Sequence, residues 1–276
     1  NNQNNENSLV NLIKKNNTII TAKPTLTTSS NNSSDASGLY VSNDTNSGQP
    51  TYYFRGSVTN NNVKFAGLTW KIVRINEDGT TRLMLNDRIG ATTYPFTTVK
   101  NMYYSNSDTA KPTVDTWYQT NIAMKGYDSY VATSTFCEQA KVKYFSDSSS
   151  GNASTTIPSS YISNFKCSTD GNGKGIISGK AGLITYDEAL HAGGYVEKDN
   201  PSNFLSNANY YIWTMSTSGQ KSGQISNWYI GKNGELGSGD VTYSLEVCLR
   251  PVINLNANVL ATGTGTSSDP YVVQTN

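Results

Sequence analysis

The chain has 276 residues, a length that fits one large domain or two small ones. It carries 21 basic and 20 acidic residues, and charged residues make up 15% of the chain, against about a quarter in average proteins. Since the sequence contains neither a basic stripe nor an apolar stretch of about 20 residues, we expect no nucleic-acid binding and no direct membrane insertion in this segment.

Residues 1–37 are expected to form an N-terminal helix followed by a polar linker. Ser8 is a suitable N-cap, and the apolar residues that follow it share one face of a helix within residues 8–20. Residues 21–35 are rich in Ser, Thr and Asn, a composition typical of exposed linkers. We therefore expect the main domain to comprise residues 38–276.

A β pattern begins after this segment. Residues 52–55 and 63–70 are strand candidates. Residues 71–75 then alternate between polar and apolar side chains, and residues 81–85 form the expected return strand. The Asp-Gly dipeptide at 78–79 is a turn signal, so a hairpin is predicted here.

The middle of the chain is predicted to contain short helices separated by loops. Residues 114–124 suit a helix, whereas residues 136–144 are compatible with either a short helix or a strand. Thr185 is a candidate N-cap for a helix over residues 186–191, which the glycines at 193–194 are expected to end.

The C-terminal third is again predicted to be β structure. Residues 210–215, 224–230, 249–255 and 271–273 are strand candidates. The Asn-Gly dipeptide at 233–234 indicates a hairpin turn. The sequence shows no internal repeat.

The cysteine count of 3 leaves one residue without an intramolecular partner. Cys137 and Cys167 each lie close to an aromatic residue and flank a polar stretch, so a disulfide between them is predicted. Closing such a loop would stabilise the protein by roughly 3–4 kcal/mol. Cys248 lies in the apolar run 245–252 and is interpreted as a small buried hydrophobe.

Side chains that usually carry catalysis are sparse. His191 is the single histidine, and its place at the end of a helix indicates a structural or capping role rather than a triad or zinc site. Asp187 and Glu188 are adjacent, diverge by about 100° on a helix, and are interpreted as helix-start electrostatics. Asp170 begins a glycine-rich turn that lacks the later acidic ligand of a calcium loop. We expect no cofactor and no metal site.

Several aromatic and apolar segments follow one another in a distinctive order. They are Gly38-Leu39-Tyr40, Tyr52-Tyr53-Phe54-Arg55-Gly56, Phe65-Ala66-Gly67-Leu68-Thr69-Trp70-Lys71-Ile72-Val73-Arg74, Leu183-Ile184-Thr185-Tyr186-Asp187-Glu188, Trp213-Thr214-Met215-Ser216 and Leu249-Arg250-Pro251-Val252-Ile253-Asn254-Leu255. Together they resemble a large, uncharacterised family of Gram-positive surface proteins. Such proteins resemble distant relatives of proteins with the C-type-lectin-like fold. Formylglycine-generating enzymes and retroelement-diversified receptor proteins also have this fold. The resemblance covers residues 38–273.

The resemblance implies an α+β fold, a C-type-lectin-like domain with small twisted antiparallel sheets and two or more short helices. It also implies that a ligand face lies in the loops before the final strands. Formylglycine-generating activity would need a reactive cysteine pair, which the predicted disulfide removes, so we expect no enzyme activity. Cys248 departs from the small polar residue expected at its position.

Residues 203–243 are dense in Tyr, Ser, Asn, Gly and Trp, the composition of antibody-like binding surfaces. In the related fold this region carries the binding face. The candidate ligand-binding residues are Trp213, Ser216, Ser218, Gln220, Gln224, Asn227, Tyr229, Asn233 and Tyr243. An alternative stays open, because Trp213 and Trp228 are equally suited to a hydrophobic core and the whole chain is rich in Asn and Ser.

These features predict an extracellular, cell-surface binding or adhesion module that recognises a protein or a glycan through the loops at 203–243, without a cofactor. The alternative is a structural subunit of a surface or pilus-like assembly, in which strand edges pair with neighbouring copies. Because the chain opens with Asn and Gln rather than with a signal peptide, we expect the signal or anchor segment to lie outside it.

Overall fold

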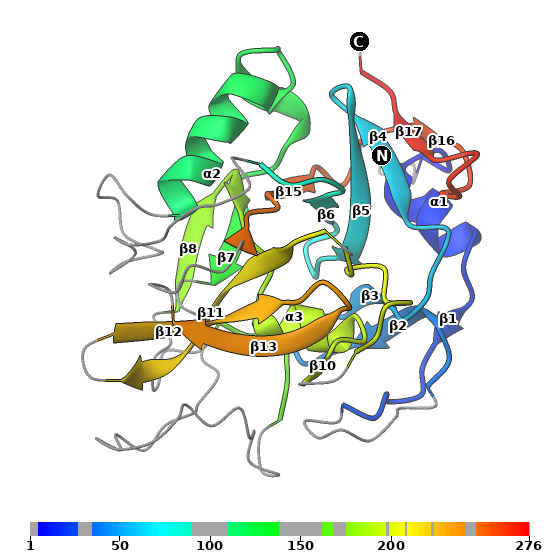
Figure 1. The fold of residues 1–276 in the computed structure, drawn as a ribbon. Helices are drawn as coiled ribbons and strands as arrows, with labels where there is room; N and C mark the ends of the chain where they lie inside the picture. The colour runs from blue at the N-terminus through cyan, green and yellow to red at the C-terminus, as the bar shows by residue number, and fades with distance from the viewer. Residues whose placement is uncertain are drawn as a thin grey trace.

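The computed structural model has a mixed α+β architecture, mostly sheet with a few short helices, as the sequence predicts (Figure 1). The described strands form sheets of ten, five and two strands. The structure describes residues 5–26, 35–89, 110–137, 162–167, 175–196, 199–207, 209–221, 224–240 and 247–275.

The ten-stranded sheet is the larger of the two main sheets. Its path runs in the order β1-β2-β3-β5-β4-β17-β16, and β6, β15 and β9 extend it from β5. Its strands are β1 Ile19–Ile20, β2 Gly38–Ser42, β3 Thr51–Arg55, β4 Asn62–Phe65, β5 Leu68–Ile75, β6 Thr81–Leu85, β9 Ala181–Gly182, β15 Val252–Leu255, β16 Ala261–Thr262 and β17 Tyr271–Val273.

The hairpin predicted around Asp78 and Gly79 joins β5 to β6 and is confirmed. Gly79 has a φ of 82°, a left-handed conformation that glycine adopts without steric cost. Ile72 and Leu83 are cross-strand partners and are fully buried in the core. The register shifts between Ile72 and Arg74, and irregularities of this kind redirect the side chains that follow them.

The N-terminal segment shares the core of the main domain. Helix α1 (Leu9–Lys15) begins after Ser8, whose side chain accepts a backbone N–H of the first turn, so the predicted N-cap is confirmed. Leu9 and Ile13 are fully buried in the main core, and Ser8 forms an isolated bridge with Leu260. Strand β1 then pairs with β2 in parallel. Residues 5–20 therefore pack on the domain that they precede.

The five-stranded sheet is ordered β10-β13-β12-β11-β14 and contains the hairpin turn predicted at 233–234. Its strands are β10 Tyr195–Val196, β11 Tyr211–Lys221, β12 Gln224–Ile230, β13 Glu235–Asp240 and β14 Val247–Cys248. Trp213 and Trp228 are fully buried, and the Trp228 ring lies 4.5 Å from the ring of Tyr186 on helix α3 (Tyr186–His191). These tryptophans are therefore core residues.

Helix α3 packs between the two main sheets, in contact with β3 on one side and with β11, β12 and β13 on the other (Figure 1). Thr185 is its N-cap, as predicted, and forms a reciprocal capping box with Glu188. At the opposite end Arg55 donates to the carbonyl oxygens of Leu190 and His191, each at 3.0 Å. The capping role suggested for His191 is therefore performed by Arg55, whose guanidinium reaches both carbonyls.

Helix α2 (Ala110–Tyr118) continues into a π-helical turn (Gln119–Ala123), which confirms the helix predicted over residues 114–124. A short 3-10 turn (Asp128–Tyr130) follows. Strand β7 (Ser134–Cys137) then pairs with β8 (Ile176–Gly179) in the two-stranded sheet. Of the two conformations compatible with residues 136–144, the strand is observed up to Cys137, and the later residues lie outside the described chain.

Candidate functional site

The predicted disulfide between Cys137 and Cys167 is present, with an S–S distance of 2.05 Å. Cys137 ends β7, and Cys167 ends the described segment 162–167, which bonds to the domain where Phe165 N donates to Asp44 O at 2.8 Å. Cys248 is free and buried, as predicted. The disulfide therefore links the two-stranded sheet to a segment held against the larger sheet.

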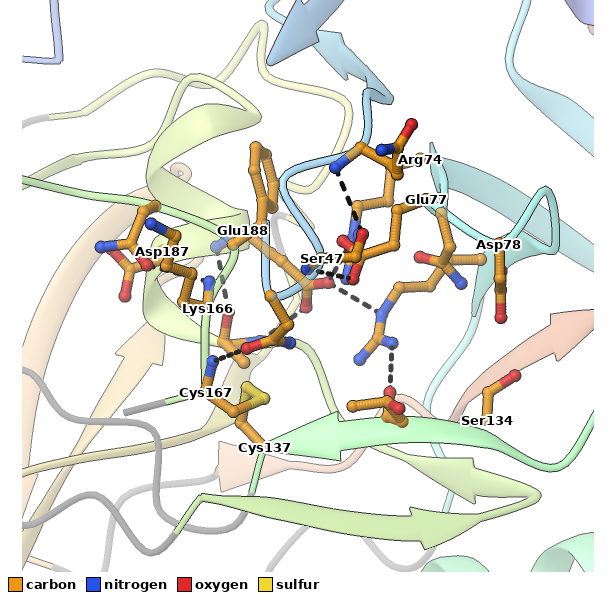
Figure 2. A pocket seen from close by; sticks show the side chains of 18 residues that line it. Ser47, Arg74, Glu77, Asp78, Ser134, Cys137, Lys166, Cys167, Asp187 and Glu188 are labelled. Carbon is orange, nitrogen blue, oxygen red and sulfur yellow. Dashed lines mark hydrogen bonds and ion pairs between the residues drawn. A yellow bond between two sulfur atoms is a disulfide. The ribbon is translucent and has the colours of Figure 1, made fainter. Parts of the chain in front are cut away.

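A pocket of about 350 Å³ lies beside this disulfide, between the β5–β6 hairpin, β7 and the start of α3 (Figure 2). Figure 2 shows Asp187, Lys166 and the disulfide toward one side and Asp78 with Ser134 toward the other. Its lining combines amides, hydroxyls, charged groups, an aromatic ring and the disulfide: Asn46, Ser47, Gln49, Arg74, Asn76, Glu77, Asp78, Arg82, Ser134, Thr135, Cys137, Asn164, Phe165, Lys166, Cys167, Thr185, Asp187 and Glu188.

Two arginines on adjacent strands form the floor of the pocket. Arg74 and Arg82 are cross-strand partners on β5 and β6, where like charges repel each other. Glu188 from α3 offsets this repulsion, because its Oε1 lies 2.9 Å from the Nε of each arginine. The side chains of Arg82 and Glu188 are only 2% and 3% exposed, so water screens this ion pair very little.

The cluster at the floor is charged at neutral pH. Burial alone would raise the pKa of Glu188, but Arg82, Arg74 and the backbone amide of Thr185 together hold it below its usual value. Burial lowers the pKa of Arg82 to about 10, although the charge of Glu188 acts in the opposite direction. The guanidinium of Arg82 is therefore ionised at neutral pH.

Carboxylates in the β5–β6 turn form the mouth of the pocket. Glu77 is half-buried, and one of its oxygens accepts the Ser47 N–H at 3.2 Å. Asp78 is exposed, and its Oδ1 accepts the Thr80 N–H at 2.9 Å. Among the described residues, the second oxygen of each carboxylate has no hydrogen-bond partner. The mouth therefore offers hydrogen-bond acceptors to a ligand, whereas the floor offers donors.

A serine, an aspartate and the histidine meet behind the pocket but are not arranged as a nucleophilic triad. The Ser163 hydroxyl donates to the Asp187 carboxylate, while His191 Nδ1 lies 2.9 Å from the carbonyl oxygen of Asp187 and 3.2 Å from Ser163 Oγ. Burial lowers the pKa of His191 to about 4, so the ring is neutral. Because the serine proton points to the carboxylate rather than to the histidine, this cluster holds segment 162–167 on α3.

Most of the described candidates from the 203–243 region are buried. These are Trp213, Ser216, Ser218 and Asn227. Ser216 Oγ accepts the Tyr186 N–H at 2.9 Å, and Asn227 Nδ2 donates to the carbonyl oxygen of Thr214 at 2.7 Å. Their polar groups connect the sheet to α3 and to itself, so burial corrects the prediction that these side chains contact a ligand.

The remaining candidates lie away from the pocket or outside the described side chains. Tyr229 is half-buried, with its ring 5.2 Å from that of Tyr211. Asn233 is exposed on the β12–β13 turn, and its Nδ2 donates to Asp199 Oδ2 at 3.2 Å. The side chains of Gln220, Gln224 and Tyr243 are outside the described part of the structure. Ligand binding by these five residues stays a prediction.

The residues at the floor are missing from the predicted site, although one signal for them exists. Arg82 stands directly before the apolar run 83–85 of a predicted strand, and a charge in a buried strand requires a partner. Glu188 is predicted only as a helix-start acid, and it is 114 positions from Arg74. The sequence therefore indicates the need for a counter-charge without identifying it.

In the part of the chain that the structure describes, no group of three or more His, Cys, Asp or Glu side chains could hold a metal ion. The glycine-rich turn at Asp170 lies outside that part. None of the described helices is long and apolar enough to cross a membrane.

Comparisons of the chain with protein-family models, with curated proteins and with solved structures find no match. The resemblance to C-type-lectin-like surface proteins accordingly stays a proposal.

Proposed function

We propose that this chain is an exported, cell-surface binding module and that its ligand is a glycan held in the pocket between the β5–β6 hairpin, β7 and α3. The Cys137–Cys167 disulfide supports export, because such bonds persist mainly in oxidising compartments. The proposal keeps the binding function predicted from composition but moves the ligand site from residues 203–243 to the pocket.

The single observation that carries the proposal is the mixture of donors and acceptors around one small cavity. A volume of about 350 Å³ falls within the range of small-molecule sites, roughly 300–1,000 Å³. Sugar hydroxyls both donate and accept hydrogen bonds, so they need a lining that supplies both kinds of group. Arginines at the floor donate, carboxylates at the mouth accept, and the amides of Asn46 and Gln49 do both.

A glycan fits this lining better than a protein surface does. Protein interfaces usually bury a broad patch with an apolar centre, whereas this site is a concave cavity that many charged and polar side chains line. The proposed C-type-lectin-like relationship is compatible with glycan binding, but a fold alone does not determine function.

The test is binding of the purified chain to an array of neutral and acidic glycans. Ser47 is exposed at the mouth, so Ser47→Trp should fill the entrance and abolish the array signal. Ser267 is exposed in the loop before β17 and is not part of the lining, so Ser267→Trp is the matched control and should bind as the wild type does.

The proposal is overturned if Ser47→Trp binds as strongly as Ser267→Trp. It is also overturned if no glycan on the array binds.

A further inference from the structure

We infer that the floor of the pocket selects a carboxylate, so that the glycan bound there contains an acidic sugar. This inference rests on the proposed function and deepens it. The proposed site is the guanidinium pair of Arg74 and Arg82, with the remaining sugar hydroxyls directed toward the mouth.

The floor of the pocket carries more buried positive than negative charge. The Nε atoms of both arginines lie within ion-pair distance of the same oxygen of Glu188, but only that of Arg74 forms a hydrogen bond with it. The second oxygen of Glu188 accepts the Thr185 N–H at 3.0 Å. The capacity of this carboxylate is thus divided between a helix cap and two cations. A second anion at the floor would remove the excess positive charge of the triad.

The two arginines also keep unused hydrogen-bonding capacity. Nη1 of Arg82 donates to the carbonyl oxygen of Thr135 at 3.3 Å, and Nη1 of Arg74 donates to Thr51 Oγ1 at 3.2 Å. Within the described residues, Nη2 of each arginine has no hydrogen-bond partner. Guanidinium groups bind carboxylates through paired N–H donors, so these nitrogens suit a carboxylate better than a lysine ammonium would.

The arginines of the floor lie deeper in the protein than the carboxylates of the mouth. Side-chain exposure is 2% for Arg82 and 11% for Arg74, whereas Asp78 is exposed and Glu77 is half-buried. Coulomb interactions of buried charges are several times stronger than those of groups in water. The field at the floor is therefore dominated by the arginines, while solvent weakens the effect of the mouth carboxylates.

Asp187 is the other buried carboxylate of the lining, and its position does not remove the imbalance. One of its oxygens accepts the Ser163 hydroxyl, next to His191. Figure 2 shows Asp187 toward the side opposite Asp78 and Ser134. Ser134, by contrast, immediately precedes the residue whose carbonyl binds Arg82, and its buried hydroxyl has no partner among the described residues.

The experiment compares acidic glycans with their carboxyl-reduced forms on the same array, using the full chain. Reduction converts each uronic-acid or sialic-acid carboxylate into a primary alcohol and leaves the other hydroxyls unchanged. We expect the reduced forms to bind at least about tenfold more weakly, as loss of a charge-assisted hydrogen bond predicts. Equal binding of both forms overturns the carboxylate inference and leaves glycan binding standing, whereas binding of no glycan overturns both.

A variant then assigns the preference to the arginines. Arg74→Gln keeps the Arg82–Glu188 pair and should lower the ratio of acidic to reduced binding by about tenfold, with binding of the reduced form retained. Asp78→Asn, which preserves the acceptor for Thr80 and removes a charge at the mouth, is the matched control and should not lower this ratio.

Thermal melting of each variant establishes that it is folded. If Arg74→Gln does not fold, Arg74→Lys replaces it, because lysine keeps the charge but loses the paired donors and should lower the ratio in part. An unchanged ratio in a folded Arg74 variant overturns the assignment.

Discussion

The five-stranded sheet and the pocket use polar side chains in opposite ways. The sheet is rich in Tyr, Trp, Ser and Asn, yet Trp213, Ser216 and Asn227 are buried, and its polar groups bond to the protein itself. The pocket is built from residues that are less distinctive in composition, and its buried arginines share one carboxylate oxygen.

The difference between these regions is the hydrogen-bonding capacity that remains after folding. A polar group that bonds within the fold stabilises the protein but has little capacity left for a ligand. Composition counts all polar groups equally, whereas binding depends on the groups that stay uncommitted at a concave surface. Variants in the two regions should therefore separate stability from recognition.

The largest effect is expected for Glu188→Gln. This change leaves two guanidinium groups at the floor without a charged partner, and breaking a buried ion pair costs about 3–5 kcal/mol. Urea unfolding measures the loss in the free energy of unfolding. Glu77→Gln at the mouth is the control and should change stability by less than about 0.5 kcal/mol; similar losses for the two variants would contradict the distinction between floor and mouth.

Removal of the disulfide should have the next largest effect on stability. The bond closes a loop with a sequence separation of 30, and the double variant Cys137→Ser/Cys167→Ser should lose roughly 3–4 kcal/mol through the entropy of the unfolded chain. Unfolding of the wild type with and without a reducing agent provides the control, since reduction should reproduce the loss. A double variant whose midpoint of urea unfolding equals that of the wild type would refute this expectation.

Acidification should lower the free energy of unfolding through protonation of His191. Burial is the main influence on the pKa of this ring, and the charges of Arg55, Arg74 and Asp44 contribute as well. Its pKa is about 4 in the folded state and 6.5 when unperturbed, so the unfolded chain binds the proton first as the pH falls. Stability present above pH 6.5 is therefore lost on acidification to pH 4, by about 3 kcal/mol. His191→Gln should flatten this dependence; the same slope in both proteins would exclude His191 as its source.

The smallest effect is expected for Asn233→Ala in the five-stranded sheet. Asn233 is exposed and its hydrogen bond to Asp199 lies at the surface, so the free energy of unfolding should change by less than about 0.5 kcal/mol. Glycan-array binding should also match that of the wild type. Loss of binding in this variant would show that the ligand site lies in the 203–243 region rather than in the pocket.

Local features were predictable because short-range chemistry decides them. The hairpin at Asp78 and Gly79 follows from turn preference, and the caps at Ser8 and Thr185 follow from side chains that accept nearby N–H groups. The disulfide followed from two cysteines beside aromatic residues. The α+β class was an expectation from the resemblance to C-type-lectin-like surface proteins, and the observed mixture of strands and short helices confirms the class.

The site was decided only by tertiary structure. Arg74 and Glu188 are 114 positions apart, and they meet because α3 packs between the two sheets. The same packing buries Trp213 and gives Arg55, rather than His191, the carbonyls at the end of α3. A sequence by itself determines which groups need partners, through turn, cap and burial preferences. Which groups become partners depends on long-range packing, because desolvation and pairing are properties of the assembled core.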